Sequence, residues 1–331
     1  MTVKRYRLLI GAGVSLLLLF LVIRNIEVGK IALALRGAGY SYLLLANLVR
    51  LGAFGLRAVR WKYLLRPVKD LRARILLPRI LIGYFGNYFL PAQSGEVLRA
   101  FALARGESLQ TSTVLATIIV ERMLDTLILL FGLLVLLCLF PLPDWIRYVG
   151  GLAGLLFAIG LLLLASWHYR EKDITHLLTT GLAKISSSLA SRVKNLLASF
   201  SRGMLILREG RGMTLSALLS FSAWSLMMAT LVLTGASLGI SLTGYVYVLL
   251  LVIFNLASLV PALPGKVGTL EFVFAGILAA FSADRSDALA FALLFRATHI
   301  LPLALGYFYL WREGFELIER AGASQEANAI S

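Results

Sequence analysis

Long apolar runs separated by short polar connections dominate the chain. A helix that crosses a membrane needs about 20 mostly apolar residues, with a range of about 17–25, and six of the runs are long enough. The predicted spans lie near 8–24, 41–63, 111–140, 145–167, 213–238 and 286–311. Two further apolar stretches, 75–106 and 245–283, are each interrupted by proline and glycine. The pattern predicts an all-α polytopic membrane protein with six spanning helices and two broken segments.

The two broken segments resemble each other. Pro91 aligns with Pro264, and one residue of slip farther along aligns Arg122 with Arg296. Broken apolar segments at corresponding positions of two halves are typical of transporters built from repeats, and they point to the substrate site. The predicted divisions are a single integral membrane domain, 1–331, with repeat 1 over about 41–140 and repeat 2 over about 213–311.

The distribution of positive charge predicts the orientation of the spans, because Lys and Arg collect on the cytoplasmic side. Segment 57–74 carries seven of them and segment 170–212 carries eight, so both are placed in the cytoplasm together with the two termini. Segment 75–106 must then enter and leave from the cytoplasmic face, and 245–283 from the opposite face. These are two re-entrant hairpins in an inverted repeat. The loop that holds Lys30 and Arg36 is placed outside despite its positive balance.

Composition supports a membrane protein. The chain is 59% hydrophobic with a mean hydropathy of +0.86, beyond the range of a soluble domain. Its net charge of +15 lies in loops between apolar spans, which excludes nucleic acid as the expected partner. Basic residues followed by the apolar run 8–23, without a small-residue cleavage site, predict a retained signal anchor. The expected location is the inner (cytoplasmic) membrane of a bacterium or archaeon.

Segment 170–212 differs from the spans. Between 182 and 209 apolar residues recur every three or four positions, with basic residues and serines on the other faces. This pattern is typical of a basic amphipathic helix that lies on the inner leaflet and contacts its anionic lipids. A cytoplasmic helix packed on the protein's own loops has the same periodicity, so both interpretations remain open.

Charged residues inside the predicted spans are the main functional signal, since each costs at least about 2.5–3.5 kcal/mol to insert. Span 111–140 holds Glu121, Arg122 and Asp125, close enough along a helix to pair. They form either a structural cluster that joins helices or a substrate or proton site. Arg296 has no acid within four residues. It requires a counter-ion from another helix, which Glu121, Asp125 or Glu271 would supply, or from a ligand.

The turns add a second signal. After each proline the chain restarts as a half-helix, with Gly95 or Gly268 allowing close backbone approach. Free N–H groups and the positive dipole ends would point into the membrane and, with Arg122 and Arg296, suit a phosphate. Glu96 and Glu271 would either cap these half-helices or couple to protons. Two further cations, Arg99 and Lys266, flank the turns and would hold headgroups or reach the interface.

Other features are weaker. Arg50, Arg57 and Arg60 are interpreted mostly as interfacial anchors. The single Cys138 excludes an intrachain disulfide, and the three histidines have no metal-ligand spacing. The sequence has no nucleophile elbow and no phosphate-binding Walker loop. We therefore expect no metal, no cofactor and no enzymatic centre.

Four motifs in order resemble the flippase-like membrane domain that forms the N-terminal transmembrane region of lysylphosphatidylglycerol synthetases and also occurs in stand-alone relatives. The motifs are Arg60-Trp61-x-x-Leu64, Asn87-x-x-Leu90-Pro91-Ala92-x-x-Gly95-Glu96-x-x-Arg99, Glu121-Arg122-x-x-Asp125 and Pro264-Gly265-x-x-Gly268-x-x-Glu271. The resemblance covers nearly the whole chain. Gln93 stands where the family commonly has Arg, and we expect no soluble aminoacyl-transferring domain after the last span. The resemblance implies lipid translocation without lipid synthesis.

The expected function is translocation of an anionic phospholipid, or of a polyprenyl- or hopanoid-type lipid, without ATP hydrolysis. The expected partners are the headgroup phosphate and inner-leaflet anionic lipids, and the pattern is compatible with a homo-oligomer. Two alternatives are a membrane scaffold or accessory subunit of a lipid-modifying enzyme and, less favoured, an integral-membrane transferase. The predicted substrate-binding residues are Asn87, Gln93, Ser94, Gly95, Glu96, Arg99, Glu121, Arg122, Asp125, Lys266, Gly268, Glu271 and Arg296.

Overall fold

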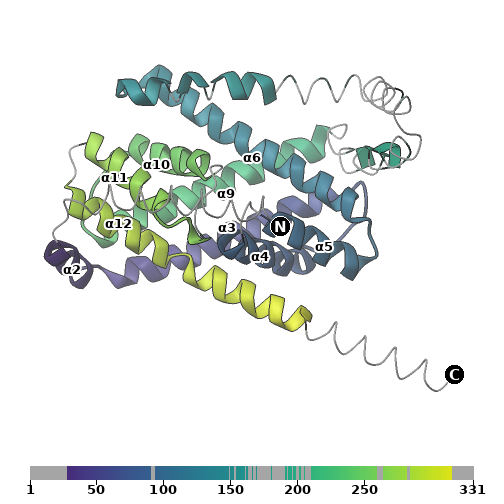
Figure 1. Cartoon of the computed structure of the whole chain (residues 1–331), viewed down its shortest axis with the longest axis horizontal. Coiled ribbons are helices and arrows are strands. Elements are labelled where there is room, and N and C mark those ends of the chain that lie inside the picture. Colours follow the sequence, from purple (N-terminus) through teal and green to yellow (C-terminus); the bar gives the residue numbers. More distant parts are fainter. Residues whose placement is uncertain are drawn as a thin grey trace, which may run out of the picture.

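The computed structural model describes residues 28–90, 94–148, 210–258, 264–281 and 284–314, with scattered positions between 150 and 205. Within these residues every regular element is a helix (Figure 1). Four helices are long and apolar enough to cross a membrane: Tyr40–Leu65, Thr111–Leu139, Gly210–Ser237 and Ser286–Gly314. They match four of the predicted spans. The predicted span 8–24 lies outside the described residues, and 145–167 and the amphipathic segment 170–212 are described only in part.

The same order of elements occurs twice along the chain. Each time a long helix is followed by two short helices and then by another long helix. The first series is α3 (Tyr40–Leu65), α4 (Ala73–Phe89), α5 (Gly95–Glu107) and α6 (Thr111–Leu139). The second is α9 (Gly210–Ser237), α10 (Gly244–Ala257), the short turn η3 (Pro264–Lys266) with α11 (Thr269–Ala280), and α12 (Arg285–Ala297), after which residues 300–314 are helical.

Each series packs around a hydrophobic core of its own, and α6 belongs to both. Its early residues, such as Val114 and Leu124, lie in a core built with α3, α4 and α5. Its later residues, such as Leu129 and Leu136, lie in a core built with α10, α11 and α12. Helices α3 and α9 pack along each other. In Figure 1 the α4–α5 hairpin lies toward the right and α10–α11 toward the left. The charged residues of α6 therefore fall at the junction of the two cores.

The α4–α5 hairpin is closed by glycines. A Cβ on Gly95 would collide with the carbonyl oxygen of Gly83 and the backbone nitrogen of Asn87, and a Cβ on Gly86 would lie 2.8 Å from the Gly95 Cα. The two backbones therefore touch at the start of α5. The reason for Gly95 is this contact, because its φ is not positive, unlike that of Gly268, which is +84°.

The tip of the second hairpin turns sharply and meets the first. Gly265, Lys266 and Gly268 all have positive φ, a region in which glycine has no steric penalty. A Cβ on Gly265 would lie 3.1 Å from the ring of Tyr88, near the end of α4. The tips of the two hairpins are thus in contact.

The last long helix is broken after α12. Pro302 has no N–H to donate to the carbonyl of Thr298, and its ring crowds that carbonyl. The helix opens into a turn at Thr298 and His299 before it resumes over 300–314.

The structure also differs from the prediction at the loop around Lys30 and Arg36. These residues form α2 (Val28–Arg36), which packs on α12.

Candidate functional site

A cavity of about 200 Å³ lies between the two series of helices. It is lined from both sides, by residues of α3 to α6 and by residues of α9 to α12 with η3. We call it the central cavity. The predicted site residues that line it are Asn87, Glu96, Arg122, Asp125, Lys266 and Arg296. The others that the structure describes are not lining residues: Ser94, Gly95, Arg99, Glu121, Gly268 and Glu271. Gln93 lies outside the described residues.

Arg60 is the centre of a buried charge cluster. Its guanidinium lies 2.5 Å from Asp125 Oδ1 and 2.9 Å from Glu121 Oε1, and it also donates to the Ser220 hydroxyl at 2.6 Å. Trp224 Nε1 donates to Asp125 at 3.0 Å. Arg60 is fully buried, so its interpretation as an interfacial anchor is wrong. It joins α3 to α6.

The first hairpin is attached to the same cluster through Arg99. Arg99 is buried, with Nε 2.7 Å from Glu96 Oε2 and Nη2 3.2 Å from Glu121 Oε1. Its guanidinium also lies 4.9 Å from the ring centroid of Trp61. The other Glu96 oxygen accepts a hydrogen bond from Asn87 Nδ2 at 3.0 Å, which links the two arms of the hairpin.

Arg122 completes the cluster on the cavity side. Its Nη2 lies 2.6 Å from Glu121 and 3.3 Å from Asp125, the second being the pair expected from the sequence spacing. Its side chain is 39% exposed. We call the whole set the α6 cluster. Its members are three arginines and three carboxylates, Arg60, Arg99, Arg122, Glu96, Glu121 and Asp125, so their charges balance.

Arg296 takes its counter-ion from the second hairpin. Its Nη2 lies 2.5 Å from Glu271 Oε1, and the other oxygen of Glu271 accepts from the Gly268 N–H at 2.8 Å. Glu271 therefore caps α11 and neutralises Arg296 at once. Arg296 Nη1 also donates to the hydroxyl of Tyr88 at 3.1 Å and to the carbonyl of Gly265 at 2.5 Å. The same guanidinium joins the tips of both hairpins.

Glu96 has no corresponding cap role at α5. The N-cap position there is Ser94, and no side-chain hydrogen bond caps that helix start. The glutamates that follow Gly95 and Gly268 in the two turns thus have different partners.

Three more cations line the central cavity, and among the described residues none of them forms an ion pair with a carboxylate. Arg57 lies between aromatic rings, 5.6 Å from the centroid of Phe54 and 5.1 Å from that of Trp224. Lys266 lies 5.1 Å from the centroid of Phe254. Arg50 contacts the neutral side chains of Tyr84, His299 and Phe295. These three residues, Arg50, Arg57 and Lys266, are the free cations of the cavity.

Arg50 is buried at the end of the cavity formed by α4 and α12. Its Nη1 lies 3.1 Å from His299 Nε2 and 3.4 Å from the hydroxyl of Tyr84. Its guanidinium lies 4.7 Å from the centroid of Phe295. Arg50 and Arg57 are both buried, so neither is an interfacial anchor. Sequence reasoning therefore missed them as cavity residues, along with Tyr84, Tyr88, Trp224 and His299.

A signal for the α3 arginines was present in their spacing. Arg50, Arg57 and Arg60 are separated by seven and by three residues, which places them on one face of a helix. Anchors are expected near the ends of a span. Three arginines on one face within a span indicate instead that this face points into the protein.

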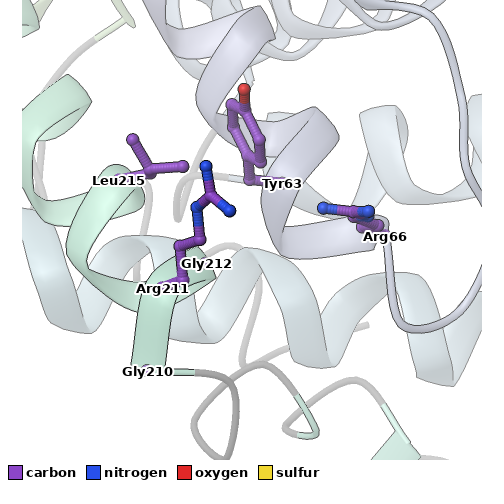
Figure 2. Close-up of a pocket in the computed structure, with 6 residues that line it drawn as sticks. All are labelled: Tyr63, Arg66, Gly210, Arg211, Gly212 and Leu215. Atoms are coloured by element: carbon purple, nitrogen blue, oxygen red, sulfur yellow. The ribbon is translucent and has the colours of Figure 1, made fainter.

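A second hollow lies at the C-terminal end of α3 and the N-terminal end of α9. Figure 2 shows the side chains of Tyr63, Arg66, Arg211 and Leu215 around it. Both arginines are exposed. They belong to the two basic segments that the charge distribution places in the cytoplasm.

Comparison with known proteins gives a consistent result. The family model described as the lysylphosphatidylglycerol synthase TM region matches residues 8–306. A UPF0104 membrane protein of Methanothermobacter thermautotrophicus is 26% identical over 298 residues, which cover 83% of this chain and 87% of that protein. A UPF0104 membrane protein of Methanocaldococcus jannaschii is 23% identical over 308 residues, covering 89% of this chain and 91% of the relative.

One similar protein carries an enzymatic name. The glycosyltransferase AglD of Haloferax volcanii is 23% identical over 324 residues, which cover 88% of this chain and 52% of AglD. This chain therefore matches about half of that protein. No solved structure matches the chain.

Proposed function

Because the chain belongs to the family of the lysylphosphatidylglycerol synthase transmembrane region, we propose that it is a lipid translocator that binds an anionic headgroup in the central cavity. The headgroup crosses between the two series of helices while the acyl chains stay in the bilayer. The proposal assigns no chemical change to the lipid and no ATP hydrolysis.

The free cations of the cavity carry this proposal. A charge inside a membrane protein is costly unless it has a partner. The arginines of the α6 cluster and Arg296 form ion pairs with carboxylates, whereas Arg50, Arg57 and Lys266 line the cavity and form none with the carboxylates that the structure describes. An anionic ligand would supply the missing charge. A phosphate suits the arginines in particular, because it matches the fork of a guanidinium.

Exposed apolar side chains beside the cavity suit the acyl chains. Val97 and Phe101 lie on α5, and Phe89 and Leu90 end α4; all four are exposed. They are close in sequence to Asn87 and Glu96, which line the cavity. A lipid bound there would place its headgroup among polar residues and its chains against an apolar surface.

We propose a topology with cytoplasmic termini, six spans and two hairpins that enter the membrane from opposite faces. Contact between the tips at Tyr88 and Gly265 supports this topology, since inverted hairpins meet near the middle of the bilayer. It places the hollow of Arg66 and Arg211 at the inner leaflet, where anionic headgroups are abundant.

Labelling from outside the cell tests this topology. In a Cys138→Ser background, Thr243→Cys is expected to react with an impermeant maleimide, and Arg211→Cys is expected to react only after the membrane is opened. Both positions are exposed in the structure, so burial does not explain a lack of labelling. Reaction at 211 in intact cells would contradict the orientation.

Reconstitution into liposomes tests the function. Fluorescent phosphatidylglycerol is expected to exchange between leaflets faster in proteoliposomes than in empty liposomes, as measured by bleaching with an impermeant reductant. Phosphatidylcholine with the same fluorophore is the matched control, and its zwitterionic headgroup should exchange more slowly. A protein that moves neither of these lipids nor a polyprenyl phosphate would be a scaffold or an accessory subunit.

A further inference from the structure

His299 contacts one of the free cations and has a single possible tautomer. Its Nδ1 lies 2.9 Å from the carbonyl oxygen of Phe295. A carbonyl only accepts hydrogen bonds, so Nδ1 carries the hydrogen. Its Nε2 lies 3.1 Å from Nη1 of Arg50. A guanidinium only donates, so Nε2 is the acceptor. The imidazole is therefore neutral in this arrangement, and it positions Arg50 at the cavity.

The groups that face His299 oppose a second proton on the ring. Arg50 approaches from α3, and the rings of Tyr84 and Tyr88 approach from α4 at centroid distances of 6.2 and 6.0 Å. Lys266 of η3 and Arg296 of α12 line the same cavity. No carboxylate hydrogen-bonds to His299 among the described residues, since Glu271 is occupied by Arg296 and Gly268. In the empty cavity, protonation would add a positive charge beside Arg50.

An anionic headgroup reverses this balance. With an anion at Arg50, the Nη1–H of Arg50 can turn from His299 to an oxygen of the headgroup. The Nε2 lone pair is then free to take a proton, and the resulting imidazolium has a counter-ion in the low-dielectric cavity. We infer that His299 is a proton-binding site whose occupancy is linked to that of the headgroup at Arg50. This inference rests on the proposed function.

Linkage of this kind is reciprocal. If the anion favours the proton at His299, the proton favours the anion by the same factor. Headgroup and proton would then enter and leave the cavity together, and a proton gradient across the membrane would drive the lipid in one direction. In this scheme the proton is the coupling ion and His299 is its binding site.

Binding of a soluble lipid to the purified protein tests the inference. Dihexanoyl phosphatidylglycerol is a suitable probe, because its phosphodiester stays singly charged between about pH 5 and pH 8. The dissociation constant of the wild-type protein is expected to fall as the pH falls, by at most about tenfold per pH unit for one linked proton. His299→Gln keeps a hydrogen-bond acceptor for Arg50 and has no titrating ring. It is expected to bind with an affinity that varies little with pH.

The controls separate this inference from the proposed function. His168→Gln makes the same substitution outside the described residues and should keep the pH dependence of the wild type. If His299→Gln also keeps it, the proton lies elsewhere and the inference is wrong, while headgroup binding stands. If the wild-type protein binds phosphatidylglycerol at no pH, the binding site fails for this class of headgroup and the linkage fails with it.

Discussion

Arg60→Leu is expected to remove most of the folded protein. The substitution leaves the α6 cluster with two arginines against three carboxylates, and the Glu121 side chain that loses a partner is fully buried. Among the described residues, the ion pair that Asp125 then keeps is the one with Arg122. Removing one partner of a buried ion pair costs about 3–5 kcal/mol, because the other charge remains buried. This is a large fraction of the stability of an ordinary domain.

Thermal unfolding in detergent, followed by size-exclusion chromatography, measures this loss. Arg60→Lys should lie between the wild type and Arg60→Leu, because the charge remains and the fork that contacts both carboxylates is lost. Arg66→Leu is the matched control near the end of the same helix. Arg66 is exposed, so its loss should change stability by no more than about 0.5 kcal/mol. An unfolding temperature for Arg60→Leu equal to that of the wild type would contradict a structural role for the cluster.

Loss of the free cations is expected to reduce transport without lowering the stability of the protein. Arg57→Met and Lys266→Met each remove a charge that has no carboxylate partner among the described residues, so no carboxylate is left unpaired. Arg57 is buried and Lys266 is half-buried, and replacing a charge that forms no ion pair by an apolar side chain of similar length should leave stability unchanged or raise it. Headgroup binding should weaken at the same time. If each charge contributes about 1.5–3 kcal/mol through charged hydrogen bonds, transport should fall about tenfold or more for each substitution.

Lipid exchange in proteoliposomes, with unfolding measured on the same preparation, distinguishes a loss of transport from a loss of stability. Arg105→Met is the matched control, since Arg105 is an exposed arginine at the end of α5 and is not a lining residue of the cavity. It should keep both transport and stability. If Arg57→Met and Lys266→Met transport like the wild type, the cavity cations do not bind the headgroup.

The long helices were predictable because their signal is local. The length of an apolar run is enough to predict a spanning helix. The four spans that the structure describes match their predicted positions within a few residues. The pairing of Arg122 with Asp125 was predictable for the same reason, since three residues along a helix bring two side chains together.

The partners of the other charges were not predictable from local spacing. Arg60 and Asp125 are 65 positions apart, and Arg50 and His299 are 249 apart. The spacing of the α3 arginines places them on one face, but only the packing of α3 against α4, α6 and α9 identifies the residues that this face contacts. Glu271 was among three acids considered for Arg296, and the choice required the geometry of the hairpin tip. The positive φ angles of Gly265, Lys266 and Gly268 at the tip likewise could not be predicted from the positions of glycine alone.

The glycine contact between α4 and α5 restricts how the molecule can change shape. A Cβ on Gly95 would meet the backbone of Gly83 and Asn87, and a Cβ on Gly86 would meet the Gly95 Cα, so the two helices touch backbone to backbone at the start of α5. The two arms must move as one rigid body. A widening of the cavity therefore has to take place between the hairpins, where the hydrogen bonds of Arg296 to Tyr88 and Gly265 hold the tips together. We therefore expect the cavity to open by a hinge motion between the hairpin tips, without repacking of α4 against α5.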